Sequence, residues 1–496
     1  MSSLPVAVHT AAQVRALDRH AIDDLQIPSY TLMTRAGEAA LGALRSCWPS
    51  AQRIAVVCGP GNNGGDGYVL ARLAREQRLE VVAVGLHEPA RLQGDARRAY
   101  DDFLAAGGTV GSWHADCLRG MDVIVDAIFG VGLSRPVDGV AAEAIAAINH
   151  SDARVLALDI PSGLHADTGE ILGDAVRAER TVTFLGLKLG FYLGEGPNCV
   201  GVVMFDGLEL PAQALAYVEA TALRIDEPEV AELLPPRRRT AHKGQQGSVL
   251  VIGGNIGMPG AARMAGEAAL RAGAGLVTIA TRNENVAAIV GARPELMCRG
   301  VNSAEELTAL IARADVLALG PGLGQDEWAQ AMFETALAKD RRVVVDADAL
   351  SLLAQSPRKN AHWILTPHPG EAARLIGKTT AEVQHDRLGA AREIAARYGG
   401  TVVLKGAGTL VLGDEGLPAI CDRGNPGMAS AGMGDVLTGV IAGIVAQKAE
   451  LAAAARVGVL VHALAGDMAA RRGERGLLAT DLLAYLPTCV NPHQRS

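Results

Sequence analysis

Residues 53–72 have the sequence RIAVVCGPGNNGGDGYVLAR, in which an apolar β-branched run passes through a glycine-rich turn into a helix-like run. Strand, glycine loop and helix in this order begin many doubly wound α/β domains. The backbone N–H groups and the dipole at such a helix N-terminus favour negative charge, so the turn is a candidate anion site. Further β-branched runs alternate with Ala-rich helical patterns along most of the chain. This alternation predicts parallel sheets covered by helices.

The length of 496 residues exceeds what one ordinary core serves and favours two large α/β domains. The run LLPPRRRT at 233–240 suits neither a helix nor a central strand, and we interpret it as a rigid, basic and solvated connector. With the boundary near 220–235, we divide the chain into residues 1–225, a doubly wound Rossmann-like domain, and 226–496, a second α/β domain. The predicted strands are 53–58, 80–84, 122–126, 154–159, 181–184, 201–204, 247–254, 316–319, 342–346, 363–366 and 401–405.

Composition narrows the class of protein. With 49% hydrophobic and 20% charged residues the chain is typical of a compact enzyme, and its net charge of −8 gives no general attraction for nucleic acid or anionic membranes. Seven scattered cysteines without a CxxC pair indicate a reducing compartment, with no disulfides and no zinc site. The start, MSSLPV, lacks a signal-peptide pattern, and the apolar run 436–446 is shorter than the about 20 residues of a membrane span. We therefore expect a cytoplasmic protein.

The glycine-rich turn of residues 59–67 has more than one possible role. GPGNNG matches GxGxxG, but this match alone is a weak signal. An NAD-dependent dehydrogenase would place an acid at the end of the next strand, and Glu88 lies several residues beyond it. Asn62, Asn63 and Asp66 supply more side-chain donors and acceptors than a pyrophosphate turn needs. A purely structural turn is the alternative.

Two carboxylates close predicted strands in the first half. Asp126 and Asp159 each end an apolar run, and the carboxyl ends of strands in open α/β sheets face the ligand crevice. Together with asparagine and serine oxygens nearby they can coordinate a monovalent or divalent cation, or act as an acid or base. The alternative is that each aspartate caps the turn that follows it.

The second half carries its own set of loops. AGMGD at 431–435 opens an apolar helix, so backbone N–H groups can approach a transferring phosphate there. Asp435 is then placed to accept a proton from a substrate hydroxyl, although a carboxylate at a helix start is also favoured by the dipole alone. His368 is held between two prolines, and a lone histidine is more often structural than catalytic.

The first half resembles the NAD(P)H-hydrate epimerase domain over residues 10–215, on the segments GPGNNGGDGYVLAR (59–72), VDAIFGVGLSRP (125–136) and DIPSGLHADTG (159–169), followed by 187–190. The resemblance implies interconversion of the R and S forms at C6 of hydrated NADH or NADPH. The residues it implies for the hydrate are Asn62, Asn63, Gly64, Gly65, Asp66, Gly130, Val131, Gly132, Leu133, Ser134, Arg135, Pro136 and Asp159. It implies a potassium ion held by Asn63, Asp126 and Ser162, and we predict Asp159 and Lys188 as the acid/base pair. Ring opening and loss of hydroxide both remain open as routes.

The second half resembles the ribokinase-like superfamily, and within it the ADP-dependent NAD(P)H-hydrate dehydratase, over about residues 230–490. The motifs are HKGxxG (242–247), GPGLG (320–324), TPHPGE (366–371), KGAGT (405–409) and AGMGD (431–435). The resemblance implies that ADP or ATP, accompanied by magnesium, contacts Lys405, Gly406, Ala407, Gly408, Thr409 and Gly434, and that the hydrate contacts Ala261, Gly322, His368 and Asp435. Met433 departs from the commoner GAGD and GTGD patterns.

We therefore interpret the chain as a bifunctional repair enzyme for NADHX and NADPHX, forming a homo-oligomer and needing neither nucleic acid nor a membrane. A ribokinase-like small-molecule kinase with an N-terminal nucleotide-binding domain would keep the same loops and release a phosphorylated product. A non-catalytic nucleotide sensor would keep the glycines and lose Asp159, Lys188 or Asp435, and all three are present. The preference between ADP and ATP, and between NADHX and NADPHX, is not encoded in any pattern we can identify.

Overall fold

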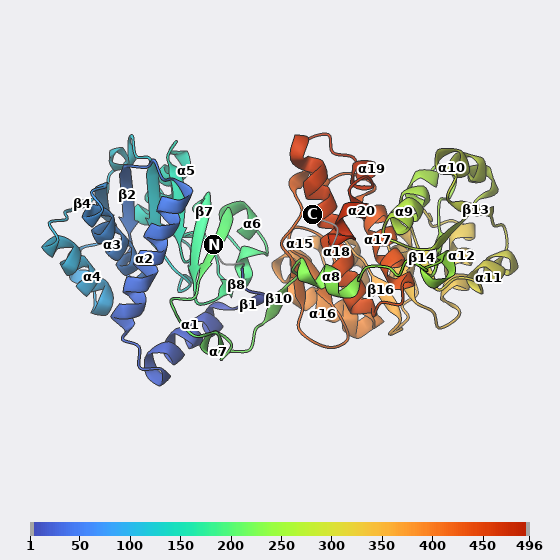
Figure 1. Cartoon of the computed structure of the whole chain (residues 1–496), viewed down its shortest axis with the longest axis horizontal. Helices are drawn as coiled ribbons and strands as arrows, with labels where there is room; N and C mark the ends of the chain where they lie inside the picture. The colour runs from blue at the N-terminus through green and yellow to red at the C-terminus, as the bar shows by residue number, and fades with distance from the viewer. Residues whose placement is uncertain (1–3, 493–496) are drawn as a thin grey trace. The chain divides into compact units, whose positions relative to one another are not determined.

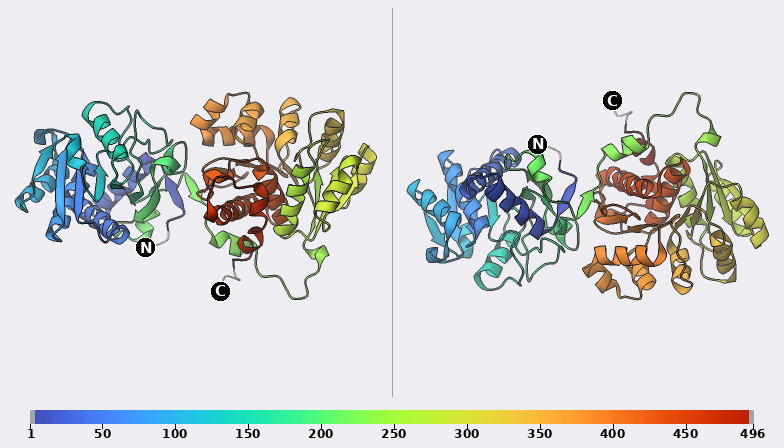
Figure 2. Two further views of the ribbon diagram at one scale, coloured as in Figure 1. Left: turned by 90° about the horizontal axis from the view of Figure 1, so that it is seen from above. Right: turned by 90° about the horizontal axis from the view of Figure 1, so that it is seen from below.

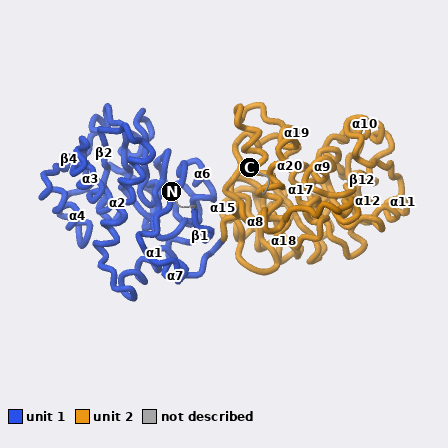
Figure 3. The backbone as a smooth tube through the Cα atoms, viewed as in Figure 1, with its two compact units in different colours: residues 1–222 blue, residues 223–496 orange. Residues whose placement is uncertain are grey.

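The computed structural model describes residues 4–492 and contains two compact units, residues 1–222 and 223–496 (Figure 3). Each unit is an α/β structure with its own sheet and its own hydrophobic core. The predicted α/β fold class is therefore confirmed.

Unit 1 contains a seven-stranded, fully parallel sheet with strand order β4-β3-β2-β5-β6-β7-β9 (Figure 1). The strands are β2 (Arg53–Cys58), β3 (Glu80–Gly85), β4 (Val110–Ser112), β5 (Val123–Ala127), β6 (Arg154–Leu158), β7 (Arg180–Phe184) and β9 (Val202–Asp206), and a short β1 (Ala7–His9) pairs in parallel with β8 (Leu187–Lys188). The helices are α1 (Ala11–Arg19), α2 (Ser29–Cys47), α3 (Asn62–Glu76), α4 (Gly94–Ala105), α5 (Gly139–His150), α6 (Gly196–Cys199) and α7 (Ala212–Leu215).

Helices cover both faces of the unit 1 sheet, as Figure 2 shows from two sides. Successive side chains of a strand point to opposite faces. Ile54 and Val56 accordingly pack in one core cluster with α2, α3 and α4, whereas Ala55 and Val57 pack in the other with α5. Burial on both faces explains why β2 is apolar from Ile54 to Cys58 rather than alternating with polar residues.

Unit 2 contains a larger sheet, in the order β13-β12-β11-β14-β15-β16-β17-β18-β19-β10, which is parallel from β13 to β17 and antiparallel around β18. The strands are β10 (Ala222–Arg224), β11 (Ser248–Ile252), β12 (Leu276–Thr281), β13 (Met297–Gly300), β14 (Val316–Leu319), β15 (Val343–Val345), β16 (Trp363–Leu365), β17 (Thr401–Leu404), β18 (Thr409–Leu412) and β19 (Ala419–Cys421). The helices are α8 (Pro228–Leu233), α9 (Pro259–Arg271), α10 (Val286–Ala292), α11 (Ala304–Ile311), α12 (Glu327–Leu337), α13 (Ala347–Gln355), α14 (Pro369–Ile376), α15 (Thr380–His385), α16 (Arg387–Tyr398), α17 (Met433–Ala446), α18 (Leu451–Ala469), α19 (Ala479–Leu482) and α20 (Leu486–Cys489).

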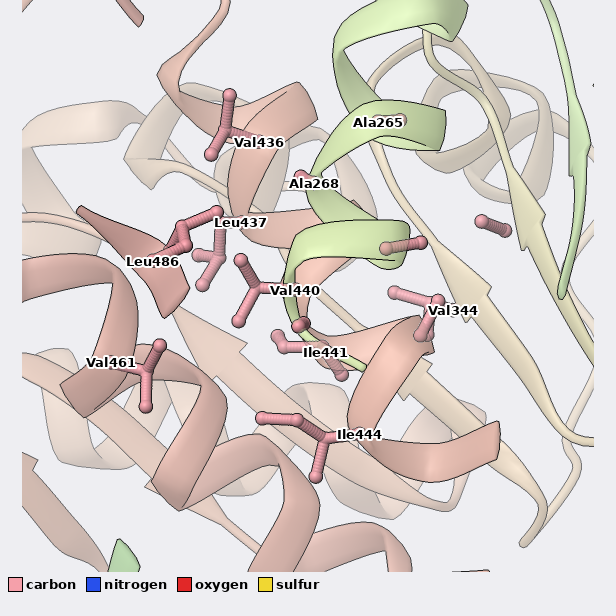
Figure 4. Close-up of a cluster of buried hydrophobic side chains, with 14 of the residues drawn as sticks. Ala265, Ala268, Val344, Val436, Leu437, Val440, Ile441, Ile444, Val461 and Leu486 are labelled. Carbon is pink, nitrogen blue, oxygen red and sulfur yellow. The ribbon is translucent and has the colours of Figure 1, made fainter. Parts of the chain in front are cut away.

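The core of unit 2 depends on a close contact between α9 and α17 (Figure 4). A Cβ atom on Gly439 would lie 2.0 Å from the Ala265 carbonyl oxygen, and one on Gly443 would lie 2.6 Å from that of Ala269. Glycine at both positions therefore lets the two helix backbones approach. This packing fixes the position of α17. The first residues of α17 belong to the loop of residues 431–435.

Each predicted strand is present in the structure, with ends that differ by one or two residues. The prediction omitted β1, β4 and β8 of unit 1, and β10, β12, β13, β18 and β19 of unit 2. The apolar run of β12 is too short to distinguish a strand from a buried helix segment by its pattern. Strand β13 is a short edge strand with an exposed Met297, so the sequence around it carries little hydrophobic signal.

One apolar helix is longer than the run 436–446, which is the apolar run considered above as a membrane span. Residues Leu451–Arg472, which include α18, are long and apolar enough by length and composition to cross a membrane, and 61% of the apolar window is buried inside the structure. Val457, Leu460 and Val461 of this helix belong to the unit 2 core. A core helix satisfies the same test, so this helix is weak evidence for a membrane span.

The basic connector is exposed over residues 235–240, in agreement with a solvated linker. Helix α8 extends to Leu233, the first residue of the predicted connector. The Arg237 guanidinium donates hydrogen bonds to the Gly273 carbonyl oxygen (2.5 Å) and to Gln447 Oε1 (3.0 Å), so it also anchors the segment to the ends of α9 and α17.

Candidate active sites

The glycine-rich turn of unit 1 joins β2 to α3 and is packed against its neighbours. A Cβ atom on Gly59 would lie 1.9 Å from the Ile128 carbonyl oxygen, and one on Gly64 would lie 2.0 Å from the Gly59 carbonyl oxygen. Helix α3 begins at Asn62, so residues 62–66 form its first turn rather than an extended loop. Their backbone N–H groups therefore belong to a helix N-terminus, where negative charge is favoured.

A buried polar cluster lies at the end of β5. The fully buried Asp126 accepts hydrogen bonds from Ser162 Oγ (2.6 Å) and from the Ser162 backbone N–H (2.8 Å). Burial raises the pKa of Asp126 to about 6, against the effect of these hydrogen bonds. The Asn63 amide nitrogen donates to the Phe129 carbonyl oxygen (3.0 Å), whereas Asn63 Oδ1 is buried and has no partner among residues 4–492. The cluster thus presents several oxygens and one uncompensated carboxylate.

Asp159 and Lys188 form an ion pair beside this cluster. The Lys188 ammonium is fully buried and donates to Asp159 Oδ1, Thr183 Oγ1 (2.6 Å) and the Phe184 carbonyl oxygen (3.1 Å). Burial lowers the pKa of Lys188, and the charge of Asp159 opposes that change. Asp159 has the left-handed backbone angle φ +64° directly after β6, an uncommon conformation for a residue with a side chain.

The second predicted hydrate loop, residues 130–136, lies near the same carboxylate. A Cβ atom on Gly130 would lie 3.4 Å from Asp159 Oδ2 and 3.5 Å from Asn63 Cβ. The Arg15 guanidinium of α1 donates to the Val131 carbonyl oxygen at 3.2 Å. The structure therefore brings Asn63, Gly130 and Asp159 together, and adds α1 to the surroundings of the loop.

Two acidic side chains near Asp159 have raised pKa values. The pKa of Asp66 lies well above its usual value because of burial and the charges of Asp159 and Asp18. Burial and Asp159 likewise raise the pKa of Asp18, a residue of α1. Sequence analysis missed Asp18, because α1 carries no motif that distinguishes this aspartate from a surface residue of an amphipathic helix.

In unit 2 a second ion pair lies between β15 and β17. Lys405 Nζ lies 2.7 Å from Asp346 Oδ1, and Thr438 Oγ1 of α17 donates to Asp346 Oδ2 at 2.8 Å. A Cβ atom on Gly434 would lie 3.2 Å from Lys405 Nζ. The structure thus joins Lys405 and Gly434, as predicted for one ligand, and adds Asp346, which sequence analysis did not identify as functional.

Asp435 lies one residue beyond Gly434 in the first turn of α17. Burial and the charge of Asp346 raise its pKa to about 7, against the attraction of Lys405. A carboxyl group with this pKa exchanges a proton readily near neutral pH. Met433 is buried in the core of unit 2, so the departure from the commoner sequence pattern leaves the glycines on either side unobstructed.

His368 has a structural role in addition to any contact with a ligand. Its Nδ1 accepts from the backbone N–H of Gly370 (3.0 Å) and caps α14, while the His368 backbone N–H donates to Glu371 Oε2 (2.8 Å). Burial lowers the pKa of His368, partly offset by Glu371. Glu371 Oε2 also lies 3.6 Å from Lys405 Nζ, which connects His368 to the buried ion pair.

Ala261 and Gly322 are neighbours, as expected of residues that contact one ligand. A Cβ atom on Gly322 would lie 3.1 Å from the Ala261 Cβ atom. An open cavity of about 390 Å³ borders this region and is lined by Gln325, Ala347, Asp348, Ser351, Ala354, Gln355, Glu371 and Arg374. Asp348 in its wall accepts from the Gly324 backbone N–H at 2.8 Å, which links the cavity to the loop after β14.

The fold and the two sites define a class of protein: an enzyme with two α/β units, each carrying a buried lysine–aspartate pair at the carboxyl edge of its parallel strands. Two family profiles match, "YjeF-related protein N-terminus" at residues 29–190 and "NAD(P)H-hydrate dehydratase" at residues 249–488. The chain is 48% identical to the bifunctional NAD(P)H-hydrate repair enzyme Nnr of Coxiella burnetii over 97% of its own length and 98% of that protein.

Two solved structures resemble unit 2. One is a ribokinase-like superfamily protein of Enterococcus faecalis (TM-score 0.51, 32% identity, 55% of this chain and 96% of that one). The other is the ADP/ATP-dependent NAD(P)H-hydrate dehydratase of Bacillus subtilis, co-crystallised with ATP and Mg²⁺ (TM-score 0.50, 31% identity, 55% of this chain and 98% of that one). The chain belongs to the family of bifunctional NAD(P)H-hydrate repair enzymes.

Proposed function

We propose that the chain repairs hydrated NADH and NADPH at two separate sites. Residues 1–225 interconvert the R and S hydrates, and residues 226–496 dehydrate the S form at the expense of ADP or ATP. The observation that carries this proposal is the presence of one buried lysine–aspartate pair in each unit, Lys188 with Asp159 and Lys405 with Asp346. Both pairs adjoin the glycine-rich loops that the family resemblance assigns to ligands.

In the epimerase unit, Asp159 is the group that exchanges a proton with the hydrate. Its carboxylate faces Gly130 and Asn63, within the two loops proposed to hold the hydrate, residues 62–66 and 130–136. Lys188 keeps this carboxylate oriented and can return a proton through it, because burial already disfavours the charged ammonium. Proton exchange at this pair is compatible with ring opening and with loss of hydroxide.

A potassium ion fits the polar cluster at the end of β5. The ligands we propose are Asn63, Asp126 and Ser162, with the Phe129 carbonyl oxygen beside them. Asn63 Oδ1 is buried without a partner in the described part of the chain, and an oxygen ligand of a cation needs no hydrogen bond. The single carboxylate suits a monovalent ion, whose charge would offset the buried Asp126 and attract the anionic hydrate.

In the dehydratase unit, Asp435 accepts the proton of the C6 hydroxyl group while that oxygen attacks the terminal phosphoryl group of the nucleotide. AMP or ADP is the leaving group of this transfer. The phosphorylated oxygen then leaves as inorganic phosphate, expelled by the lone pair of the ring nitrogen, and the resulting iminium ion loses a proton from C5 to give NADH or NADPH. Ala261, Gly322, His368 and Asp435 would hold the hydrate. The nucleotide would lie against Lys405, Gly406, Ala407, Gly408, Thr409 and Gly434.

Magnesium fits this site as a companion of the nucleotide rather than as a resident ion. Among residues 4–492 no group of three or more His, Cys, Asp or Glu side chains could hold a metal. The nearest buried carboxylates, Asp346 and Glu371, are engaged by Lys405. Phosphate oxygens and water would therefore supply most ligands, as Mg²⁺ commonly prefers, and the ion would neutralise phosphate charge.

The direct experiment adds purified protein and ADP or ATP to a mixture of R and S NADH hydrate and follows the absorbance of reduced nicotinamide. Full, nucleotide-dependent recovery of NADH is expected. Recovery that stops when the S form is consumed would contradict the epimerase assignment. Accumulation of a stable phosphorylated compound without NADH would instead support a ribokinase-like small-molecule kinase. The homo-oligomeric state and the cytoplasmic location stay predictions.

A further inference from the structure

A buried arginine lies beneath the proposed nucleotide loop. Arg387, the first residue of α16, is 4% exposed, and its Nη1 donates to Gln384 Oε1 at 2.7 Å. Its Nη2 lies 3.2 Å from the Leu404 carbonyl oxygen, 3.3 Å from that of Lys405 and 3.5 Å from that of Gly408. Within residues 4–492 no carboxylate forms an ion pair with this guanidinium, so its contacts are the loop backbone and one amide oxygen.

The contact with the Lys405 carbonyl oxygen determines the direction of a backbone N–H group on the opposite side of the loop. In a trans peptide the C=O and the N–H point in opposite directions. Because the Lys405 carbonyl oxygen faces Arg387, the N–H of Gly406 is directed away from it, toward the exposed side of the loop. The N–H groups of Gly406, Ala407 and Gly408 donate to no acceptor in the described chain. They are therefore available to an anion.

Glycines make this loop prone to peptide rotation. Gly406 has φ +134° and Gly408 has φ +62°, conformations that glycine reaches easily and leaves easily. A Cβ atom on Gly406 would lie 3.1 Å from Arg387 Nη1, so the guanidinium lies directly against this residue. The guanidinium keeps its N–H donors in one rigid plane, whereas a lysine ammonium is carried on a flexible four-carbon stem and positions its acceptors less strictly.

The charge of Arg387 survives its burial. Burial lowers the pKa of Arg387 to about 10, which leaves the guanidinium protonated at neutral pH. A positive charge behind the loop also favours phosphate in front of it.

We propose that Arg387 is a positioning residue for the nucleotide: it holds the carbonyl groups of residues 404, 405 and 408, and thereby keeps the loop in the conformation in which the free N–H groups of residues 406–408 can meet the nucleotide phosphates. This inference rests on the proposed function, because it assumes that the loop binds ADP or ATP. Arg387 itself lies on the far side of the loop and does not touch the ligand. Its loss therefore affects nucleotide affinity rather than the contact with the hydrate.

The test compares Arg387→Met and Arg387→Lys with the full-length wild-type protein. The measurements are the Kd for ADP and ATP by calorimetry, the KM for S NADH hydrate and the melting temperature. We expect Arg387→Met to raise the nucleotide Kd by at least about tenfold, corresponding to 1.4 kcal/mol, with an unchanged KM for the hydrate. Arg387→Lys keeps the positive charge but not the planar guanidinium group, and we expect a smaller rise of the nucleotide Kd.

Arg392→Met, at an exposed position of the same helix, is the matched control and should leave all values unchanged. If Arg387→Met is insoluble, Arg387→Lys and Gln384→Ala, which removes the Nη1 acceptor, carry the test. A folded variant with wild-type nucleotide Kd would overturn the inference. A parallel loss of nucleotide and hydrate affinity would do the same, since it indicates general damage. If the wild-type protein binds no nucleotide, the proposed function fails instead.

Discussion

The two buried lysine–aspartate pairs differ in which partner is the more exposed. In unit 1 the lysine is hidden and the acid is accessible: the side chain of Lys188 is 0% exposed and that of Asp159 is 15% exposed. In unit 2 the acid is hidden and the lysine is accessible: Asp346 is 1% exposed and Lys405 is 18% exposed. Similar chemical groups at the same edge of two parallel sheets thus present a carboxylate in one unit and an ammonium in the other.

This inversion matches the chemistry proposed for each unit. Both proposed epimerisation routes need an accessible group that exchanges a proton with the C6 hydroxyl group, whereas phosphoryl transfer needs a fixed positive charge near phosphate oxygens. The pKa directions agree: burial lowers the pKa of Lys188, while at Lys405 burial is outweighed by Asp346 and Glu371, which raise the pKa. Lys405 therefore stays charged, which agrees with the proposal that a third residue, Asp435, is the base of unit 2.

The largest expected effect is the loss of that third residue. Asp435→Asn preserves shape and removes the base, so dehydration of the S hydrate should fall about 10²–10⁴-fold, the usual contribution of a general base. Epimerisation should stay at the wild-type rate because its acid/base pair lies in unit 1. The measurement is nucleotide-dependent formation of NADH, with epimerisation followed by chromatography of the R and S forms. A loss of both activities would contradict two independent sites.

The reciprocal change is Asp159→Ala, which removes the accessible member of the pair in unit 1. We expect epimerisation to be abolished and dehydration of pure S hydrate to continue. Because Lys188 would be left buried without its countercharge, unit 1 should also lose about 3–5 kcal/mol of unfolding free energy. Thermal melts therefore accompany the assay, and Asp159→Asn is the isosteric control. Epimerisation that survives both changes in folded protein would remove Asp159 from the mechanism.

A third prediction concerns the pH dependence of dehydration in unit 2, and it leaves Asp159 and Asp435 in place. The raised pKa of Asp435, about 7, means that its carboxyl group becomes protonated as pH falls through neutrality. Dehydration should therefore decline below about pH 7. Asp346→Asn removes a negative charge that raises the Asp435 pKa and should move this midpoint to lower pH. An unchanged midpoint in a folded Asp346→Asn variant would show that the two carboxylates are not coupled.

The smallest expected effect is on stability. The pKa of Asp435 is about 7 in the folded state and 3.8 for a free aspartate, so ionisation in the folded state opposes folding at neutral and higher pH. The neutral carboxyl group's contribution to the free energy of unfolding is complete below about pH 4. It is lost progressively as pH rises through about 7. Asp435→Asn should therefore raise the Tm by a few degrees at pH 8 and have little effect at pH 4. An equal shift at both pH values would point to packing instead.

Local signals explain most of what the sequence predicted. Short β-branched runs such as 53–58 and 401–404 became strands, because buried parallel strands are apolar on both faces. Asp126, Asp159 and Lys405 could be identified because each immediately follows or ends such a run. Asp346 has the same position after β15, but α13 follows it directly in place of a glycine-rich loop.

Other features of the sites had no local signal. Arg387 lies 18 residues before Lys405 and resembles any basic residue at a helix start, so its place beneath the loop depends on how α16 packs beside β17. For His368 both a ligand contact and a structural role were considered, and the structure gives it a helix cap that the sequence did not specify. Asp18 acquires a raised pKa only because α1 lies beside the loops of unit 1.

The sequence by itself determined the alternation of strands and helices and the loops where ligands are expected, because these depend on neighbouring residues and on backbone propensity. Only the tertiary structure decided which partner of each lysine–aspartate pair is buried. That choice depends on the burial of side chains from strands far apart in the chain, and burial sets both the pKa values and the group that a ligand meets.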